Sequence, residues 1–325
     1  MNTIKRIAVL TSGGDAPGMN AAIRAVVRTG IYHDLDVIGV QEGYQGLVDN
    51  AMHLFTTKDV ANIIQRGGTI LKTARSEDFT TSEGRKKAFR HLQEHQVDAL
   101  ITIGGDGTFK GASVFSDEYQ IPVLGIPGTI DNDIAGTEYT IGFDTAVNTA
   151  IEAIDKIRDT ASAHDRVFVV EVMGRHSGLI ALQSGVSCGA EDILVPEQKT
   201  DFDQLIREIN YDKRRNKYMR IIVVSEGDDF GGANKVADEI SRRFPKLDVR
   251  PTILGHIQRG GSPTHYDRWM ASRFGYEAVK AILRHESKKM LALKNGRIQL
   301  VPFENDEPRP QPHLTQLEMA KILSF

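Results

Sequence analysis

The sequence predicts an α/β protein of two Rossmann-like three-layer domains, each with a mostly parallel sheet. Short apolar runs recur along the chain and end in glycine or aspartate, which is typical of buried parallel strands. Segments with helical periodicity separate these runs, and this alternation indicates doubly wound sheets. With 325 residues the chain exceeds a typical single core. This length predicts two domains, and the long helix expected from residue 142 is a natural route into the second.

The first expected elements are a strand at 7–10, a glycine turn and a helix at 19–32. The strand is fully apolar, and the helix carries alanine, isoleucine and valine at helical spacing on one face. A second strand is expected at 36–40. Residues 43–46, with two glycines around Tyr44, are expected to form a loop.

The remaining elements follow the same alternation. Further strands are expected at residues 101–103, 122–126, 167–173, 192–195 and 221–225. Further helices are expected at residues 82–95, up to 115, at 142–163, at 263–285 and from 315. The proline-rich stretch before the last helix is expected to be irregular.

The composition excludes several classes of function. A net charge of -3 argues against bulk nucleic-acid binding. No apolar run approaches the ~20 residues of a membrane helix, and no signal-peptide core follows the first residues. The single cysteine, Cys188, excludes an internal disulfide and is compatible with a reducing cytosol. We expect a cytoplasmic protein with no nucleic-acid or membrane partner.

Three aspartates follow the ends of two expected strands. Asp106 comes after the strand at 101–103, and Asp131 and Asp133 come after the strand at 122–126. Ligands of open α/β sheets bind beyond the carboxyl ends of the strands. Oxygen ligands of this kind suit Mg²⁺ carrying phosphate. One such aspartate alone is more often a turn cap, but three at adjacent strand ends favour catalysis.

Two further features suggest anion binding. The glycine turn at Gly13-Gly14 precedes a helix, so its backbone N–H groups can approach a phosphate, although a simple tight connection is equally compatible. It is not a Walker loop, because the lysine that ends one is missing. Arg24 and Arg28 share one face of the first helix and form either a solvated pair or an anion site.

Five motifs, in order, resemble those of the bacterial ATP-dependent 6-phosphofructokinases. They are TSGGDAPGMN at 11–20, GGDG at 104–107, PGTIDND at 127–133, MGR at 173–175 and GHIQRGGSP at 255–263. The resemblance runs from about residue 4 to about residue 284. It implies transfer of the γ-phosphoryl group of Mg-ATP to the 1-hydroxyl of fructose 6-phosphate. It also implies an ATP-binding domain at residues 1–142 plus 258–308 and a domain at residues 143–257 plus 309–325 that binds the sugar phosphate.

The resemblance assigns roles to the aspartates. Asp131 is implied to be the general base, Asp133 to support it or the metal's water shell, and Asp106 to face Mg²⁺. The catalytic set implied by the family is Asp131, Asp133, Arg175, Gly14 and Thr129. The hydroxyl of Thr129 could touch the phosphoryl group or only cap its turn.

Nine residues match the family's nucleotide site. They are Gly14, Tyr44, Arg75, Ser76, Phe79, Gly105, Asp106, Gly107 and Thr108. Tyr44 and Phe79 could equally be packing residues. Pyrophosphate-using relatives have an aspartate where this chain has Gly107 and a lysine where it has Gly128, so two glycines here leave room for ATP as the donor.

Ten residues match the family's sugar-phosphate site. They are Thr129, Asp131, Arg166, Met173, Gly174, Arg175, Glu226, Arg250, His256 and Arg259. A single arginine is usually solvated, and a single histidine is more often structural. Five cations at strand or turn ends, with Glu226 among them, favour a sugar phosphate.

The family is tetrameric, so the resemblance implies a homotetramer in which Arg166 and Arg250 reach the sugar phosphate of a neighbouring subunit. Seven residues match effector sites for ADP or phosphoenolpyruvate: Arg24, Arg28, Arg158, Gly189, Glu191, Arg215 and Lys217. The chain departs from the family pattern at Thr57, Asn62, Tyr218 and Met219. Because several usual cations are missing there, we expect only a weak response to effectors.

Two other classes of protein compete with this interpretation. An NAD or lipid kinase would share residues 104–108 but neither the loop at 129–133 nor the later arginines. A catalytically silent nucleotide sensor would lack at least one of Asp106, Asp131 and Arg175, and the chain retains all three.

Overall fold

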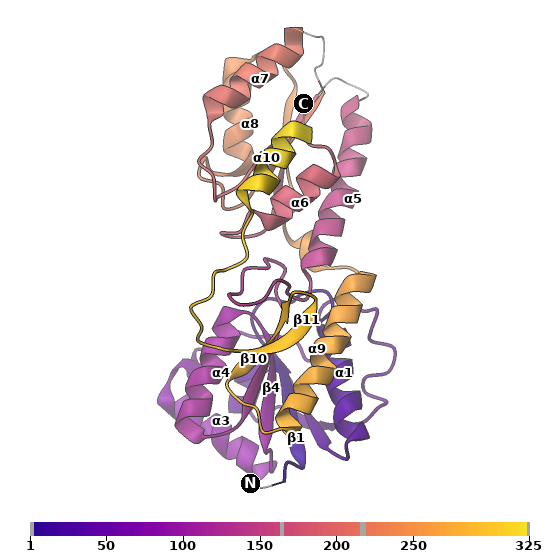
Figure 1. Ribbon diagram of the computed structural model, residues 1–325, viewed down its shortest axis with the longest axis vertical. Helices are drawn as coiled ribbons and strands as arrows, with labels where there is room; N and C mark the ends of the chain where they lie inside the picture. The colour runs from indigo at the N-terminus through magenta and orange to yellow at the C-terminus, as the bar shows by residue number, and fades with distance from the viewer. Residues whose placement is uncertain (1–2, 163–165, 215–218, 324–325) are drawn as a thin grey trace. The chain divides into compact units, whose positions relative to one another are not determined.

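The computed structural model describes residues 3–162, 166–214 and 219–323 (Figure 1). The chain divides into two compact units. Unit 1 comprises Met1–Ile130, Ile134–Thr145 and Arg259–Pro310, and unit 2 comprises Asp131–Asp133, Ala146–Gln258 and Gln311–Phe325. Each unit contains its own sheet.

Unit 1 contains a seven-stranded sheet in the order β11-β10-β5-β4-β1-β2-β3. Its strands are β1 (Arg6–Thr11), β2 (Asp36–Val40), β3 (Met52–Phe55), β4 (Ala99–Gly104), β5 (Val123–Pro127), β10 (Lys289–Lys294) and β11 (Arg297–Pro302). All pairs are parallel except those of the two edge strands, β3 with β2 and β11 with β10. The register pairs Thr11 with Ile103 and Gly104 with Pro127, so the loops that follow β1, β4 and β5 emerge at the same edge.

Helices cover both faces of this sheet (Figure 1). They are α1 (Met19–Tyr32) and α9 (His265–Leu283) on one face, and α2 (Gly43–Val48), α3 (Ser82–Glu94) and α4 (Asp106–Tyr119) on the other, with a 3₁₀ turn, η1, at Asp78–Thr80. Helices α1 and α9 run side by side. On the other face, Phe115 of α4 is fully buried in a core that includes Leu10 and Leu100 of the sheet and Leu92 of α3.

Unit 2 contains a four-stranded, fully parallel sheet in the order β7-β8-β6-β9. Its strands are β6 (Val167–Val172), β7 (Asp192–Leu194), β8 (Arg220–Ser225) and β9 (Val249–Ile253). Its helices are α6 (Leu179–Ser187), α7 (Phe202–Arg214), α8 (Gly232–Arg243), α10 (Leu314–Leu323) and most of α5 (Phe143–Ser162), whose first three residues belong to unit 1. A 3₁₀ turn, η2, lies at Gly255–Arg259, and its last residue belongs to unit 1. Apolar residues of α7 and α8 pack together against β6 and β8. Within the described residues, no helix is long and apolar enough to cross a bilayer.

The predicted fold class is confirmed, because both sheets are mostly parallel and helices alternate with strands. The expected loop at residues 43–46 is wrong, because α2 begins at Gly43. Two glycines lower the helix propensity of this segment, but Tyr44, Leu47 and Val48 are buried in the core of unit 1, and their packing outweighs that cost. The sequence also failed to indicate β3, β9 and the β10–β11 hairpin.

Candidate active site

The loops after β1 and β4 are joined through Thr108. Its Oγ1 donates to the carbonyl of Ser12 at 3.1 Å, and the N–H of Ser12 donates to the carbonyl of Ile103 at 3.0 Å. A Cβ on Gly104 would lie 2.3 Å from Thr108 Oγ1 and 2.4 Å from the Ser12 carbonyl oxygen. Only glycine fits at this position, so the glycine motif brings the two loops into direct contact.

Asp106 begins α4 and is exposed at the first turn of that helix. Its Oδ2 lies 2.5 Å from Nη2 of Arg309, a residue of the proline-rich segment that the sequence analysis did not assign to the site. No sequence signal places residue 309 beside residue 106, because the contact depends on the chain's return after β11. Beside Asp106, a Cβ built on Gly107 would meet nothing within 4 Å. The first turn of α4 is therefore open, negatively charged and already attractive to a cationic group.

Arg259 lies against the Gly13-Gly14 turn. A Cβ on Gly14 would be 3.1 Å from Nη1 of Arg259, so a larger residue would press on the guanidinium. In the part of the chain that the structure describes, the buried Nε of Arg259 has no hydrogen-bond partner. The sequence analysis matched Gly14 to the nucleotide site and Arg259 to the sugar-phosphate site, and the structure brings the two together within unit 1. An arginine with an unused donor beside backbone N–H groups suits an anion.

Tyr44 and Phe79 are buried in the core rather than open to a ligand. Their rings stack with centroids 4.2 Å apart, and the hydroxyl of Tyr44 donates to the carbonyl of Thr108 at 2.5 Å. This is the packing role that the sequence left open for both residues. Nearby, Ser76 Oγ donates to Gln45 Oε1 at 2.7 Å, and Arg75 is exposed.

Asp131 and Arg175 come together within unit 2. Nε of Arg175 lies 3.4 Å from Oδ2 of Asp131. The Asp131 residue is only 2% exposed, whereas the Arg175 side chain is 61% exposed. A buried carboxylate paired with an accessible cation can receive a proton from a substrate while the cation contacts an anionic group.

Glu226 fixes the backbone that carries Arg175. Its Oε1 accepts the N–H of Arg175 at 2.8 Å and that of Gly174 at 3.3 Å. This support is needed because Arg175 has φ 52°, in the left-handed region that side chains other than glycine seldom adopt. The pairing of Val172 with Ser225 places residues 173–175 and 226 beside each other at the carboxyl edge of the sheet. Met173 is buried at the same edge.

Arg166 and Arg250 lie at the opposite edge of the unit 2 sheet. Both pair with Asp248, through Nε of Arg166 at 2.6 Å and Nε of Arg250 at 2.6 Å. The two arginines lower the pKa of the Asp248 carboxyl, with the hydrogen bond from Arg166 as the larger cause. Arg166 precedes the six residues of β6, which span about 20 Å at ~3.3 Å per residue, and Arg175 follows them. Arg250 pairs with Phe168, the second residue of that strand. The unit 2 sheet of a single subunit therefore does not bring Arg166 and Arg175 to the same end of the sheet.

The remaining predicted residues occupy loops and turns. Thr129 is half-buried, and its carbonyl accepts the hydroxyl of Thr140 at 2.7 Å. Asp133 is half-buried in the same loop as Asp131. His256 is exposed on η2.

The predicted effector residues are divided between the two units. Arg24 and Arg28 lie on α1 of unit 1, where burial and then Arg28 lower the pKa of Arg24. In unit 2, Arg158 Nη2 donates to the carbonyls of Cys188 at 2.6 Å and Gly189 at 3.0 Å. Arg215, Lys217 and Tyr218 lie outside the described residues.

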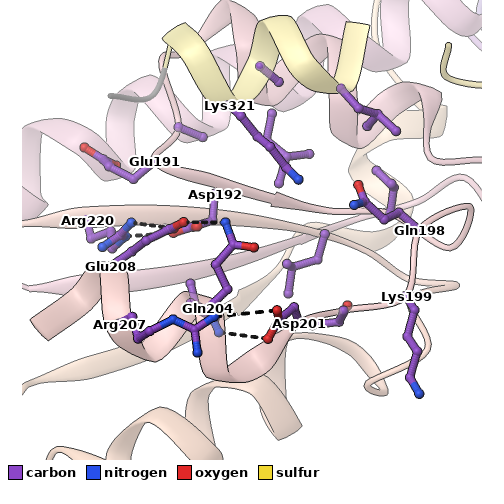
Figure 2. Close-up of a pocket in the computed structure, with 18 of the residues that line it drawn as sticks. Glu191, Asp192, Gln198, Lys199, Asp201, Gln204, Arg207, Glu208, Arg220 and Lys321 are labelled. Carbon is purple, nitrogen blue, oxygen red and sulfur yellow. Dashed lines mark hydrogen bonds and ion pairs between the residues drawn. The ribbon is translucent and has the colours of Figure 1, made fainter. Parts of the chain in front are cut away.

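Unit 2 also holds a cavity of about 1050 Å³ between β7, α7 and α10 (Figure 2). Glu191 lies at its wall and accepts the N–H of Ile221 at 2.8 Å. Arg220 bridges Asp192 at 2.7 Å and Glu208 at 3.5 Å inside it. Burial is the main cause that raises the pKa of Asp192, and Arg220 opposes that rise. Glu191 is the one residue of the predicted effector set among the described residues that line this cavity.

Comparison with known proteins identifies the family to which the chain belongs. The phosphofructokinase profile matches residues 6–282. The chain belongs to the phosphofructokinase family. An "ATP-dependent 6-phosphofructokinase 2" of Bacteroides thetaiotaomicron is 50% identical over 312 residues, which cover 95% of this phosphofructokinase and 96% of that protein. An "ATP-dependent 6-phosphofructokinase 1" of Thermus thermophilus is 52% identical over 323 residues, covering 99% of this chain and 100% of that one.

Solved structures agree on the fold of this phosphofructokinase. The phosphofructokinase of Saccharomyces cerevisiae superimposes with a TM-score of 0.87 and 35% identity over 98% of this chain. The chain spans less than half of that longer yeast chain, 46% of its length. A pyrophosphate-dependent phosphofructokinase from Marinobacter aquaeolei gives a TM-score of 0.84 at 21% identity, covering 98% of this chain and 91% of that one. The Marinobacter protein is named pyrophosphate-dependent, whereas the Bacteroides and Thermus relatives are named ATP-dependent, so the shared fold alone does not select the donor.

Proposed function

We propose that this chain is an ATP-dependent 6-phosphofructokinase, which transfers the γ-phosphoryl group of ATP to the 1-hydroxyl of fructose 6-phosphate in glycolysis. The observation that carries the proposal is the identity of about 50% to curated ATP-dependent 6-phosphofructokinases over nearly the whole chain. The pairing of buried Asp131 with accessible Arg175 supports it, because the reaction needs a base for a sugar hydroxyl and a cation for phosphate. The single cysteine supports a cytoplasmic location.

On the acceptor side, Asp131 takes the proton of the 1-hydroxyl as the oxygen attacks the γ-phosphorus. Arg175 lies beside that carboxylate and balances the charge that develops on the transferring group. Glu226 keeps Arg175 in place and can accept a hydrogen bond from a sugar hydroxyl. Asp133 and Thr129 support the same loop.

On the donor side, the nucleotide phosphates bind between the Gly13-Gly14 turn and the first turn of α4. The open position at Gly107 leaves space for them, and the helix N-terminus offers N–H donors. Arg259, against Gly14, supplies a further cation. Since only a glycine stands at residue 107, no carboxylate repels the phosphates of ATP there.

Asp106 fits a role toward Mg²⁺. Its exposed carboxylate already holds a cationic group, Arg309. Among the described residues, no cluster of three His, Cys, Asp or Glu side chains could hold a metal, which suits an ion that reaches its site on substrate phosphates and takes one or two protein carboxylates. Bound there, Mg²⁺ would neutralise charge on the phosphates.

The separation of the arginines supports a homotetramer with shared sites. Arg166 and Arg175 stand at the two ends of the six-residue strand β6, about 20 Å apart along the backbone, and Arg250 shares Asp248 with Arg166, so one subunit does not bring all three arginines to one sugar phosphate. A neighbouring subunit would bring Arg166 and Arg250 to the sugar phosphate of the first. The pairing of both arginines with Asp248 keeps them side by side for that role.

The family resemblance supports an effector site for ADP or phosphoenolpyruvate between subunits, with Arg24 and Arg28 of unit 1 and Arg158, Gly189 and Glu191 of unit 2 among its residues. Thr57 and Asn62 are exposed and uncharged where the family usually has charged residues. We therefore expect millimolar phosphoenolpyruvate to raise the half-saturating sugar concentration only slightly.

A coupled assay with fructose 6-phosphate and Mg-ATP tests the proposal. We expect ADP formation that depends on the sugar phosphate. ADP formation only with NAD or a lipid would favour the other kinases, and nucleotide binding without turnover would favour a sensor. Mixing chains carrying Asp131→Asn with chains carrying Arg166→Ala tests the shared site, because subunit exchange should restore partial activity. Complete absence of recovery would indicate self-contained sites.

A further inference from the structure

The Asp267 carboxylate is fully buried near the start of α9 and accepts four hydrogen bonds. Oδ1 accepts the hydroxyl of Tyr139 at 2.5 Å and the N–H of Gly142 at 2.6 Å. Oδ2 accepts the N–H of Thr145 at 2.8 Å and its hydroxyl at 2.5 Å. Asp267 thus holds both the segment before α5 and the first turn of α5.

The segment held by Asp267 pairs in turn with the end of β5. The N–H of Ile141 donates to the carbonyl of Pro127 at 3.0 Å, and Ile141 forms a parallel bridge with Gly128. Thr140 Oγ1 donates to the carbonyl of Thr129 at 2.7 Å. Asp267 therefore binds Tyr139, Gly142 and Thr145 directly, and residues 140 and 141 of the same segment bind the backbone at 127–129 that leads into Asp131.

The same segment also packs on the turn after β1. Gly142 has φ 105°, and a Cβ there would lie 2.6 Å from Cβ of Ala16. A Cβ on Gly18 would lie 2.6 Å from Cγ2 of Ile141 and 3.5 Å from Cβ of Asp267. Because these groups leave no free space between them, a shift of residues 139–142 would be transmitted to the turn after β1 and to the loop after β5.

We infer that Asp267 is a positioning residue for phosphoryl transfer: through Tyr139, Gly142 and Thr145 it fixes residues 139–142, and through them the reactive loop at 127–129. The inference rests on the proposed function. Asp267 itself touches no reacting group, since it is fully buried beneath the loops. Its side chain acts on the reaction only by fixing where the Thr129 and Asp131 backbone lies.

A carboxylate is required because all four partners donate. An asparagine has one acceptor oxygen and one NH₂ donor group. Whichever way the amide is turned, its NH₂ faces the N–H of either Gly142 or Thr145, and that backbone group loses its acceptor. Asp267→Asn therefore disturbs the segment while preserving the shape and volume of the side chain.

Asp98→Asn provides a matched control. Oδ2 of Asp98 accepts the backbone N–H groups of Lys5 at 2.7 Å and Arg6 at 2.9 Å. Asp98 precedes β4, so it lies at the amino edge of the same sheet, away from the loops at 104–108 and 127–133. Both variants remove a carboxylate that binds two backbone N–H groups, but only Asp267 connects to the reactive loop.

The test measures kcat and KM of both full-length variants at matched folded fraction. We expect Asp267→Asn to lower kcat about 10- to 100-fold, because a misplacement of about 1 Å has an effect of this size, and to change the KM for ATP less than about threefold. Asp98→Asn should leave kcat within about twofold of wild type. Equal losses of kcat in the two variants, or none in Asp267→Asn, would overturn the inference.

A second variant, Thr140→Val, breaks the other end of the path at Thr129. If both variants act through that path, the kcat loss of the double variant is smaller than the product of the two single losses, and a loss equal to the product would contradict the path. If Asp267→Asn does not fold, Tyr139→Phe and Thr140→Val decide, and unchanged kcat in both would reject the inference. A wild-type chain without sugar-dependent ADP formation would instead refute the proposed function, so the two failures remain distinct.

Discussion

The substitution Gly107→Asp should weaken ATP binding without disturbing the fold. Gly107 is exposed in the first turn of α4, and a Cβ there would meet nothing within 4 Å. A carboxylate near a helix N-terminus is itself favourable by about 0.3–1 kcal/mol. The free energy of unfolding should therefore stay equal to that of the wild type or rise slightly.

The expected loss of affinity comes from charge repulsion. For unit charges about 5 Å apart, Coulomb's law gives roughly 1 kcal/mol in water and about 3 kcal/mol at the effective dielectric of a protein surface. These values correspond to about a 5- to 150-fold rise in the KM for ATP. Asp106 is already present beside this position, so a second carboxylate also doubles the negative charge at the start of α4.

The assay measures KM for ATP and the Kd of Mg-ADP by calorimetry for Gly107→Asp, Gly107→Asn and Gly107→Ala. Asparagine reproduces the shape without the charge, and alanine adds only the Cβ. Both controls should stay within about threefold of wild type, and the difference between the aspartate and asparagine variants should shrink as salt is added.

Two results would refute this reasoning. If Gly107→Asn loses as much affinity as Gly107→Asp, the effect is steric and not electrostatic. If Gly107→Asp leaves both KM and Kd unchanged, the nucleotide does not bind at the first turn of α4.

Three further predictions follow from the site and the core. Asp131→Asn should lower kcat by ~10²–10⁴ with little change in the KM for ATP, because a general base acts in the transition state. If Asp133→Asn showed that loss of kcat and Asp131→Asn did not, the roles of the two aspartates would be reversed. Burial raises the pKa of the Cys188 thiol to about 11. Alkylation of Cys188 at pH 8, followed by mass spectrometry, should therefore be about two orders of magnitude slower than that of an unperturbed thiol, and its rate should rise up to about pH 11. An alkylation rate that stops rising below pH 9 would contradict this. Phe115→Ala should lower the free energy of unfolding by about 3–5 kcal/mol in urea titrations, because Phe115 is fully buried in the core. Tyr32→Ala, at an 83% exposed position, should change it by less than about 0.5 kcal/mol. Equal effects of the two substitutions would show that burial does not set the loss of stability.

Local patterns in the sequence determined the class of fold and the order of its main elements. Helix α1 runs from Met19 to Tyr32, the bounds expected from its apolar spacing. The strands that end in glycine and aspartate lie in parallel sheets, because fully apolar runs of this length must be buried on both faces. Motif order also placed Asp131 and Arg175 in one candidate site, and the structure brings them within 3.4 Å.

The tertiary structure alone decided how distant residues combine. Arg309 contacts Asp106 because the chain returns after β11, and Asp267 binds residues more than 120 positions earlier in the chain. The structure likewise made a helix of Gly43–Val48 and put Arg166 and Arg175 at opposite edges of one sheet. Periodicity and propensity act over a few residues, whereas these contacts depend on strand order and on which side chains can share a buried space. That physical difference explains why the sequence predicted the elements and the loop aspartates, and only the folded chain revealed the carboxylate beneath them.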